Sequence, residues 1–186
     1  MNPTMAKKPE IDYSKIELLV LDVDGVMTDG GITLTPAGEE IKTFHSRDGA
    51  GMRYWRRAGG KIAMLTGRSS PAVERRAADL GVDCLRMGAK DKLPPYLEVL
   101  RELGVSEDRV AVVGDDLPEL PLLRRCGMPV AVAGAVAEVR AAAAYVTKAP
   151  GGGGAVREVI ELILRGAGKW EGILARYLGE GRAAGP

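Results

Sequence analysis

The stretch that decides the fold is LLVLDVDGVMTDGG, residues 18–31. Four aliphatic residues, Leu18 to Leu21, run directly into Asp22 and Asp24. A continuous apolar run that ends in polar residues is typical of a strand buried in a parallel sheet. Because burying a carboxylate is costly unless it is paired or binds a cation, two aspartates at this point indicate a functional site.

Further apolar runs share this pattern and alternate with segments of helical periodicity. We predict strands in IELLVLD, KIAMLTG, CLRMG, RVAVVGD, PVAVAG and AYVTKA, which begin at residues 16, 61, 84, 109, 129 and 144. Between them, residues 93–100 and 156–164 carry apolar side chains at helical spacing, and Ser70-Pro71 is a typical helix start. The alternation predicts an α/β fold with a doubly wound parallel sheet.

One segment interrupts the alternation directly after the first strand. Residues 31–44, GITLTPAGEEIKTF, predict two strands joined by a turn at Pro36–Gly38, which would form a projecting β-hairpin. The length of 186 residues favours a single domain, which we place at 15–167 after a flexible N-terminus at 1–14. Residues 168–186 predict a short helix, which either docks on the domain or reaches a neighbouring subunit, followed by a disordered tail.

The composition excludes several classes of function. Lys and Arg total 26 against 25 for Asp and Glu, so the chain lacks the broad positive field of a nucleic-acid or membrane-surface binder. Two cysteines without a CxxC pair and one histidine support neither a disulfide framework nor a Cys/His zinc site. No segment reads as a signal peptide or a membrane span. We expect a cytoplasmic protein whose partners are small molecules or copies of itself.

Polar residues follow several of the predicted strands. In a doubly wound sheet, ligands bind outside the carboxyl ends of the strands, so these residues should meet at one edge. They are Asp22, Asp24, Thr66, Gly67, Arg68, Asp115 and Asp116, together with Lys92 at the start of the helix after CLRMG. Aspartates, a threonine and a lysine are the groups needed to handle a phosphoryl group with a divalent cation.

Charge repulsion explains why the cation is needed. A carboxylate approaching a phosphate dianion is repelled by about 4 kcal/mol per charge pair at roughly 4 Å and an effective dielectric near 20. Mg²⁺ can neutralise this repulsion, because it takes hard oxygen ligands and needs only one or two carboxylates besides the substrate phosphate. Thr66 and Lys92 would then hold the remaining phosphoryl oxygens.

The four segments DVDGV, LTGR, KDKL and VVGDD occur in the order of the motifs of the haloacid dehalogenase superfamily of phosphohydrolases, which the chain resembles. The resemblance implies that Asp22 attacks phosphorus to form an aspartyl-phosphate, and that Asp24 protonates the leaving oxygen and later activates water. It also implies that Mg²⁺ is held by Asp22, the backbone carbonyl of Asp24, and Asp115. Asp116 would lie behind these ligands.

A closer resemblance covers most of the chain. DGVMTDGGITL, FHSRDGAGMR, LTGRSS, KDKLPPY, GDDLPELP and GGGGAVREV are similar to the 3-deoxy-D-manno-octulosonate 8-phosphate phosphatases of lipopolysaccharide synthesis. This implies a capless enzyme whose hairpin assembles a homotetramer, with a neighbouring subunit closing each active site. The implied substrate-binding residues are Asp24, His45, Ser46, Arg47, Asp48, Gly49, Arg53, Arg68, Arg76 and Lys92. The arginines suit the carboxylate of a sugar acid, which matches a guanidinium fork.

Two positions depart from that family pattern. Glu119 stands where an aspartate is expected, and Ser46 stands where the residue is often apolar. From the residues alone, His45 also fits a solvated hairpin end, and Arg53 and Arg76 also fit surface ion pairs.

Three alternative functions stay open. Related phosphatases act on nine-carbon sialic-acid-type 9-phosphates with nearly the same motifs. A phosphorelay receiver domain also combines a doubly wound sheet with an acidic cluster, a threonine and a lysine, although receivers are shorter and have no hairpin after the first strand. A non-catalytic oligomerisation module is the third alternative. Phosphocysteine, phosphohistidine and P-loop chemistries find no matching motif.

Overall fold

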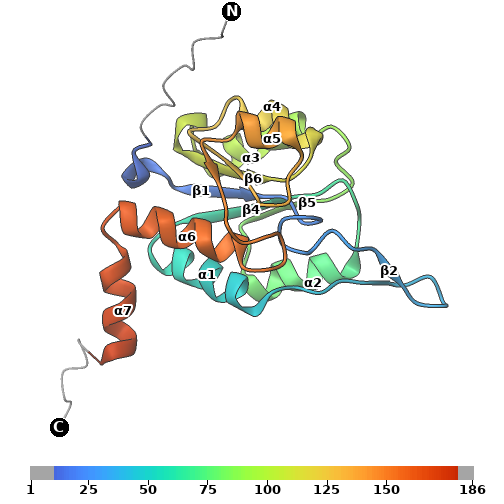
Figure 1. Ribbon diagram of the computed structural model, residues 1–186, viewed down its shortest axis with the longest axis horizontal. Coiled ribbons are helices and arrows are strands. Elements are labelled where there is room, and N and C mark those ends of the chain that lie inside the picture. The colour runs from blue at the N-terminus through green and yellow to red at the C-terminus, as the bar shows by residue number, and fades with distance from the viewer. Residues whose placement is uncertain (1–10, 180–186) are drawn as a thin grey trace, which may run out of the picture.

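The computed structural model describes residues 11–179 of the chain. Its middle layer is a parallel sheet with the strand order β5-β4-β1-β6-β7-β8 (Figure 1). The strands are β1 (Leu18–Leu21), β4 (Lys61–Leu65), β5 (Cys84–Arg86), β6 (Val110–Gly114), β7 (Met128–Ala131) and β8 (Tyr145–Val146). Each lies within one of the six predicted apolar runs or overlaps it, so the predicted parallel sheet is confirmed.

Helices cover both faces of this sheet (Figure 1). One face carries α1 (Ser46–Arg57), α2 (Pro71–Leu80) and α6 (Ala155–Gly166), and the other carries α3 (Leu93–Leu103), α4 (Leu120–Leu123) and α5 (Ala137–Ala142). Short 3-10 turns are η1 (Tyr13–Lys15), η2 (Glu107–Arg109) and η3 (Leu117–Glu119). The doubly wound α/β class predicted from the alternation is therefore confirmed.

The sequence signals at the helix ends explain where the chain turns. α3 ends at Gly104, whose φ of 64° is in the left-handed region that favours glycine. Pro71 opens α2 as predicted, but the side chain of Ser70 donates and accepts no capping hydrogen bond. In the sheet, Leu18, Leu19 and Leu21 are fully buried, and each contributes about 1.5–3 kcal/mol of hydrophobic stabilisation.

The segment after β1 forms a separate antiparallel pair. Strands β2 (Thr33–Leu34) and β3 (Glu40–Ile41) pair with Thr33 opposite Ile41 and project from the body of the molecule (Figure 1). The side chains of Ile32, Leu34 and Ile41 are 56%, 59% and 52% exposed. These aliphatic side chains therefore form an exposed apolar surface on the hairpin.

Helix α7 (Trp170–Leu178) docks only by its first part. Trp170 is 5% exposed and packs edge-on against Tyr54, with ring centroids 6.2 Å apart, whereas Leu178 is 67% exposed. Residues 1–10 of the expected flexible N-terminus and 180–186 of the expected disordered tail lie outside the described residues. Between residues 11 and 179, no helix is both long and apolar enough to cross a membrane.

Candidate active site

The carboxyl ends of the central strands open into one cavity. β1 leads into Asp22 and Asp24, β4 into Thr66, and β6 into Asp115. The cavity has a volume of about 360 Å³ and is lined by Asp22, Asp24, Thr66, Gly67, Arg68, Ala89, Lys90, Lys92, Asp115, Asp116, Pro118 and Glu119. The structure thus brings together every residue of the edge cluster predicted from the sequence.

The loop after β1 brings Asp22 and Asp24 close to Asp115. Gly25 has a φ of 94°, and a Cβ at this position would overlap the carboxylate of Asp115. The glycine run at 151–154 packs against the same loop, because the backbone N–H of Gly152 donates to the carbonyl of Val26 at 3.0 Å. A Cβ at Gly151 would overlap the carbonyl of Gly25. The glycine run therefore allows close backbone packing beside the site.

Lys92 is the buried cation of the cavity. Its Nζ donates to Asp22 Oδ1 and to Glu119 Oε1, both at 2.5 Å, and its side chain is 5% exposed. Burial opposes the charged form, but the two carboxylates raise the pKa of Lys92 above its usual value. Lys92 therefore stays protonated and offers a fixed positive charge beside Asp22.

The acidic residues of the cavity repel one another. Burial raises the pKa of Asp22 to about 6, against the attraction of Lys92. Burial likewise raises the pKa of Asp115 to about 7, with further contributions from the charges of Asp22 and Glu119. One carboxylate oxygen from each of Asp22, Asp115 and Glu119 lies within 4.8 Å of the others. Asp22 and Asp115 offer hard oxygen donors that fit a Mg²⁺ ion, whose charge would favour the ionised form of both carboxylates.

The contacts of Glu119 explain why a glutamate stands where an aspartate is expected. Its longer side chain reaches Lys92 with one oxygen and accepts hydrogen bonds from the backbone N–H groups of Asp115, at 3.4 Å, and Asp116, at 3.1 Å, with the other. Asp116 in turn accepts a hydrogen bond from the N–H of Leu117 at 2.8 Å and starts η3. Glu119 therefore orients both Lys92 and the turn that carries Asp115.

Asp24 belongs to a second charged group at the mouth of the cavity. The Nζ of Lys42 donates to Asp24 Oδ1 and lies 3.3 Å from Glu40 Oε1. Arg68 donates to the same Glu40 oxygen at 2.8 Å, and its Nε lies 4.0 Å from Asp24 Oδ2. Burial alone would raise the pKa of Glu40, but the hydrogen bond from Arg68 and the charge of Lys42 lower it below its usual value. Two cations and two carboxylates thus balance at the base of the hairpin.

The remaining substrate-binding residues implied by the resemblance lie away from this cavity. His45 precedes α1 with a buried Nδ1 that has no hydrogen-bond partner among residues 11–179, and Asp48 is buried and accepts from the N–H of Arg157 at 2.7 Å. Three further residues of the implied set lie on α1 and are exposed, namely Ser46, Arg47 and Arg53. Of the predicted set, only Asp24, Arg68 and Lys92 line the catalytic cavity.

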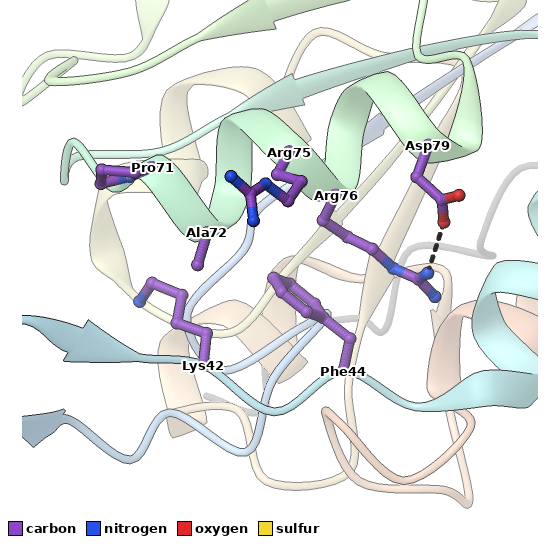
Figure 2. Close-up of a pocket in the computed structure, with 7 residues that line it drawn as sticks. All are labelled: Lys42, Phe44, Pro71, Ala72, Arg75, Arg76 and Asp79. Carbon is purple, nitrogen blue, oxygen red and sulfur yellow. Dashed lines mark hydrogen bonds and ion pairs between the residues drawn. The ribbon is translucent and has the colours of Figure 1, made fainter.

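Arg76 and Gly49 pack against each other. A Cβ at Gly49 would overlap the guanidinium of Arg76, which also lies 5.7 Å from the ring centroid of Phe44 and 2.9 Å from Asp79. Figure 2 shows Arg76 directed along α2 toward Asp79, in a groove of about 620 Å³ that is distinct from the catalytic cavity.

Sequence reasoning missed Lys42 and Glu40 as members of the site. The available signal was the alternation along the hairpin strand, which puts Glu40, Lys42 and Phe44 on one side and Ile41 on the other. Charged residues on the inner side of such a strand need partners, and here the partners are Asp24 and Arg68.

Comparison with known proteins agrees with this geometry. A family profile described as haloacid dehalogenase-like hydrolase matches residues 37–127. The chain is 44% identical over 154 residues to the 3-deoxy-D-manno-octulosonate 8-phosphate phosphatase of Escherichia coli strain K12, which covers 83% of this chain and 82% of that protein. It is 45% identical over 159 residues to the Yersinia pestis enzyme of the same name, with 86% and 85% covered.

A solved structure is also similar throughout. The 3-deoxy-D-manno-octulosonate 8-phosphate phosphatase from Moraxella catarrhalis, in complex with magnesium ion, phosphate ion and KDO, is 37% identical. It superposes with a TM-score of 0.87 over 89% of this chain and 95% of that one. A doubly wound sheet with an acidic cluster, Thr66 and Lys92 at its carboxyl edge is the arrangement of a haloacid dehalogenase-like hydrolase. Within that class, the chain belongs to the 3-deoxy-D-manno-octulosonate 8-phosphate phosphatase family.

Proposed function

We propose that the protein hydrolyses 3-deoxy-D-manno-octulosonate 8-phosphate to the free sugar acid and inorganic phosphate. The observation that carries this proposal is the placement of Asp22, held by Lys92, and Asp24 in one cavity with Asp115. The names of the curated relatives and the sugar acid bound to the M. catarrhalis enzyme support this choice of substrate.

In the first half-reaction, a carboxylate oxygen of Asp22 attacks phosphorus and the bond to the sugar oxygen breaks. Asp24 donates its proton to that departing oxygen, and an aspartyl-phosphate forms at Asp22. Thr66 and Lys92 hold phosphoryl oxygens during the transfer. Lys92 is suited to this role because its ammonium is fixed by two carboxylates and is almost fully buried, so its field is not screened by water.

In the second half-reaction, Asp24 takes a proton from a water molecule that attacks the same phosphorus. The bond between phosphorus and Asp22 breaks, and phosphate leaves. Asp22, Asp115 and the backbone carbonyl of Asp24 would hold the Mg²⁺ ion. When bound, the ion supplies positive charge that offsets the repulsion between Asp22 and the phosphate. Glu119 supports this arrangement through its contacts with Lys92 and with the turn at Asp115.

We further propose a homotetramer assembled through the hairpin. The exposed aliphatic side chains Ile32, Leu34 and Ile41 support a contact between copies, since they lie on a projecting two-stranded unit. Some of the exposed residues on α1 would then contact substrate in a neighbour's site, namely Ser46, Arg47 and Arg53. Deleting residues 33–43 should give a folded, dissociated and nearly inactive protein. Light scattering that still shows a tetramer, with full turnover, would contradict this role.

A cytoplasmic location is part of the proposal. The two cysteines, Cys84 and Cys126, are both free, which suits a reducing compartment.

A panel of phosphate esters tests the proposed substrate. Phosphate release is measured for the eight-carbon 8-phosphate, a nine-carbon sialic-acid-type 9-phosphate and simple hexose phosphates, with Mg²⁺ or with EDTA. We expect the highest kcat/KM for the eight-carbon compound, and loss of turnover in EDTA and in Asp22→Asn. A preference for the nine-carbon compound would reject the substrate and keep the chemistry. Stable labelling of Asp22 without turnover would instead favour a receiver-like function.

A further inference from the structure

Lys42 is a buried cation on an otherwise exposed segment. It follows β3 directly, and it shares one side of the strand with Glu40 and Phe44, because alternate residues of an extended chain face the same way. On the opposite side, Ile41 is 52% exposed, whereas the side chain of Lys42 is only 1% exposed. Figure 2 shows Lys42 and Phe44 pointing from this segment toward α2. A lysine so deeply buried needs partners of opposite charge.

The two carboxylate oxygens of Asp24 have different surroundings. Lys42 Nζ donates to Oδ1, while Oδ2 is buried and has no hydrogen-bond partner among the described residues. Glu40, 3.3 Å from Lys42 Nζ, provides a second negative charge and is itself held by Arg68. Lys42 is therefore fixed by two carboxylates, and it anchors Oδ1 of Asp24, while Oδ2 accepts no hydrogen bond and has only the more distant charge of Arg68, 4.0 Å away, beside the catalytic cavity.

We propose that Lys42 is a positioning residue for Asp24 in the step that expels the sugar, an inference that rests on the proposed function. By holding Oδ1, Lys42 fixes the side-chain orientation of protonated Asp24 so that Oδ2, which accepts no hydrogen bond, carries the proton toward the bridging oxygen of the substrate. As the bond from Asp22 to phosphorus forms and the phosphorus–sugar bond breaks, the proton of Asp24 moves to the departing sugar oxygen. Lys42 would act through Asp24, whose Oδ1 it holds, and not on the substrate itself.

The arrangement also ties the hairpin to the chemistry. Glu40 and Lys42 both belong to the returning strand of the hairpin and its continuation, and both connect to residues of the catalytic cavity, Asp24 and Arg68. The hairpin is therefore linked directly to the side chain of Asp24.

Two substrates with different leaving groups test the proposal. An alkyl phosphate, such as the sugar acid 8-phosphate, needs a proton on its departing oxygen, whereas p-nitrophenyl phosphate releases a stable phenolate without one. The quantity compared is kcat/KM, because it includes expulsion of the leaving group and excludes later hydrolysis of the aspartyl-phosphate. For Lys42→Met we expect a loss of about tenfold or more on the sugar phosphate and less than about threefold on p-nitrophenyl phosphate.

Conservative and matched variants complete the design. Lys42→Arg keeps a positive charge and should restore part of the lost activity on the sugar phosphate, and Lys42→Gln replaces Lys42→Met if the latter does not fold. Arg75→Met is the matched control, since Arg75 lines the same groove as Lys42 but makes no hydrogen bond or ion pair within residues 11–179. It should keep the wild-type ratio of the two kcat/KM values.

Asp24→Asn separates this proposal from the proposed function. If Asp24→Asn lowers kcat/KM equally for both substrates, the role proposed for Asp24 is wrong. A second outcome would leave the role of Asp24 intact: Asp24→Asn lowers kcat/KM selectively for the sugar phosphate. If Lys42→Met and Lys42→Gln then lower kcat/KM equally for both substrates, or for neither, Lys42 has a structural role or none, and the positioning proposal is wrong.

Discussion

Replacing Asp115 with asparagine should stabilise the metal-free protein and abolish its binding of Mg²⁺. The carboxylate of Asp115 shares a cluster with those of Asp22 and Glu119, in which one oxygen of each lies within 4.8 Å of the others. Asparagine has nearly the same shape and no charge, so it removes two repulsive pairs. Only one cation, Lys92, contacts this cluster among the described residues, and it pairs with Asp22 and Glu119.

The size of the effect follows from the geometry and the pKa. Two unit charges 4.8 Å apart repel by about 3.5 kcal/mol at an effective dielectric near 20, and Lys92 offsets part of this repulsion. The rise in the pKa of Asp115 from 3.8 to about 7 corresponds to about 4 kcal/mol. Because Asp115 is partly exposed, solvent screening reduces that figure, and we expect a gain of about 2 kcal/mol in the free energy of unfolding at pH 8.

The pH dependence gives the sign of the effect. The folded-state pKa of Asp115 lies above the unfolded-state value, so the stability that its neutral form provides is lost as the pH rises from about 4 to about 7. The advantage of Asp115→Asn should therefore be small near pH 4, about half developed at pH 5.5, and constant above pH 7.

Urea unfolding in EDTA at pH 5.5 and pH 8 measures this difference. Asp116→Asn is the matched control, because Asp116 is adjacent, lines the same cavity, and lies outside the three-carboxylate cluster. We expect it to change the free energy of unfolding by less than about 0.5 kcal/mol at either pH. The reasoning is refuted if Asp115→Asn destabilises the metal-free protein at pH 8, or stabilises it equally at both pH values.

Three further predictions concern the same cavity. Gly25→Ala places a Cβ on the Asp115 carboxylate, so calorimetry should show Mg²⁺ binding weakened at least about tenfold. Gly38→Ala is the control, because Gly38 also has a positive φ but no atom lies within 4 Å of its added Cβ, and this variant should bind Mg²⁺ normally. Glu119→Gln keeps an acceptor for the turn but loses the charge opposite Lys92, so kcat should fall about tenfold while the melting temperature changes little; an unchanged kcat would contradict this. Because the pKa of Asp115 is about 7, Mg²⁺ binding should release about one proton at pH 6.5 and almost none at pH 8.5. Calorimetry in two buffers measures this release, and equal proton release at both pH values would contradict the prediction.

The sheet was predictable because each strand is a continuous apolar run that ends in glycine or a polar residue. Helix α1 gave no comparable signal. Its buried face includes Gly49 and Gly51, which have low helix propensity and no apolar side chain to reveal a periodic pattern. Tertiary packing explains why both positions are glycine, since a Cβ at Gly49 would overlap Arg76 and a Cβ at Gly51 would press on Arg157. Such close approaches leave no trace in local sequence.

The catalytic cluster was predictable from topology, because parallel strands deliver their carboxyl ends to one edge. Asp22, Thr66 and Asp115 meet for that reason. The contact between Lys42 and Asp24 joins residues 18 positions apart and depends on how the hairpin folds back over the cavity. Likewise, the side chain of Glu119 turns toward Lys92 only because η3 begins at Asp116. Side-chain direction after a turn is set by packing and not by the pattern of residue types.

The most direct test of the account is to trap phosphate on Asp22. The enzyme with Mg²⁺ and the sugar acid 8-phosphate is quenched within a turnover and reduced with borohydride, which converts an aspartyl-phosphate to homoserine, and the peptide containing residues 18–31 is sequenced by mass spectrometry. We expect homoserine at position 22 alone. Phosphate release at full rate with no modification at position 22, or with modification at another aspartate, would contradict the account.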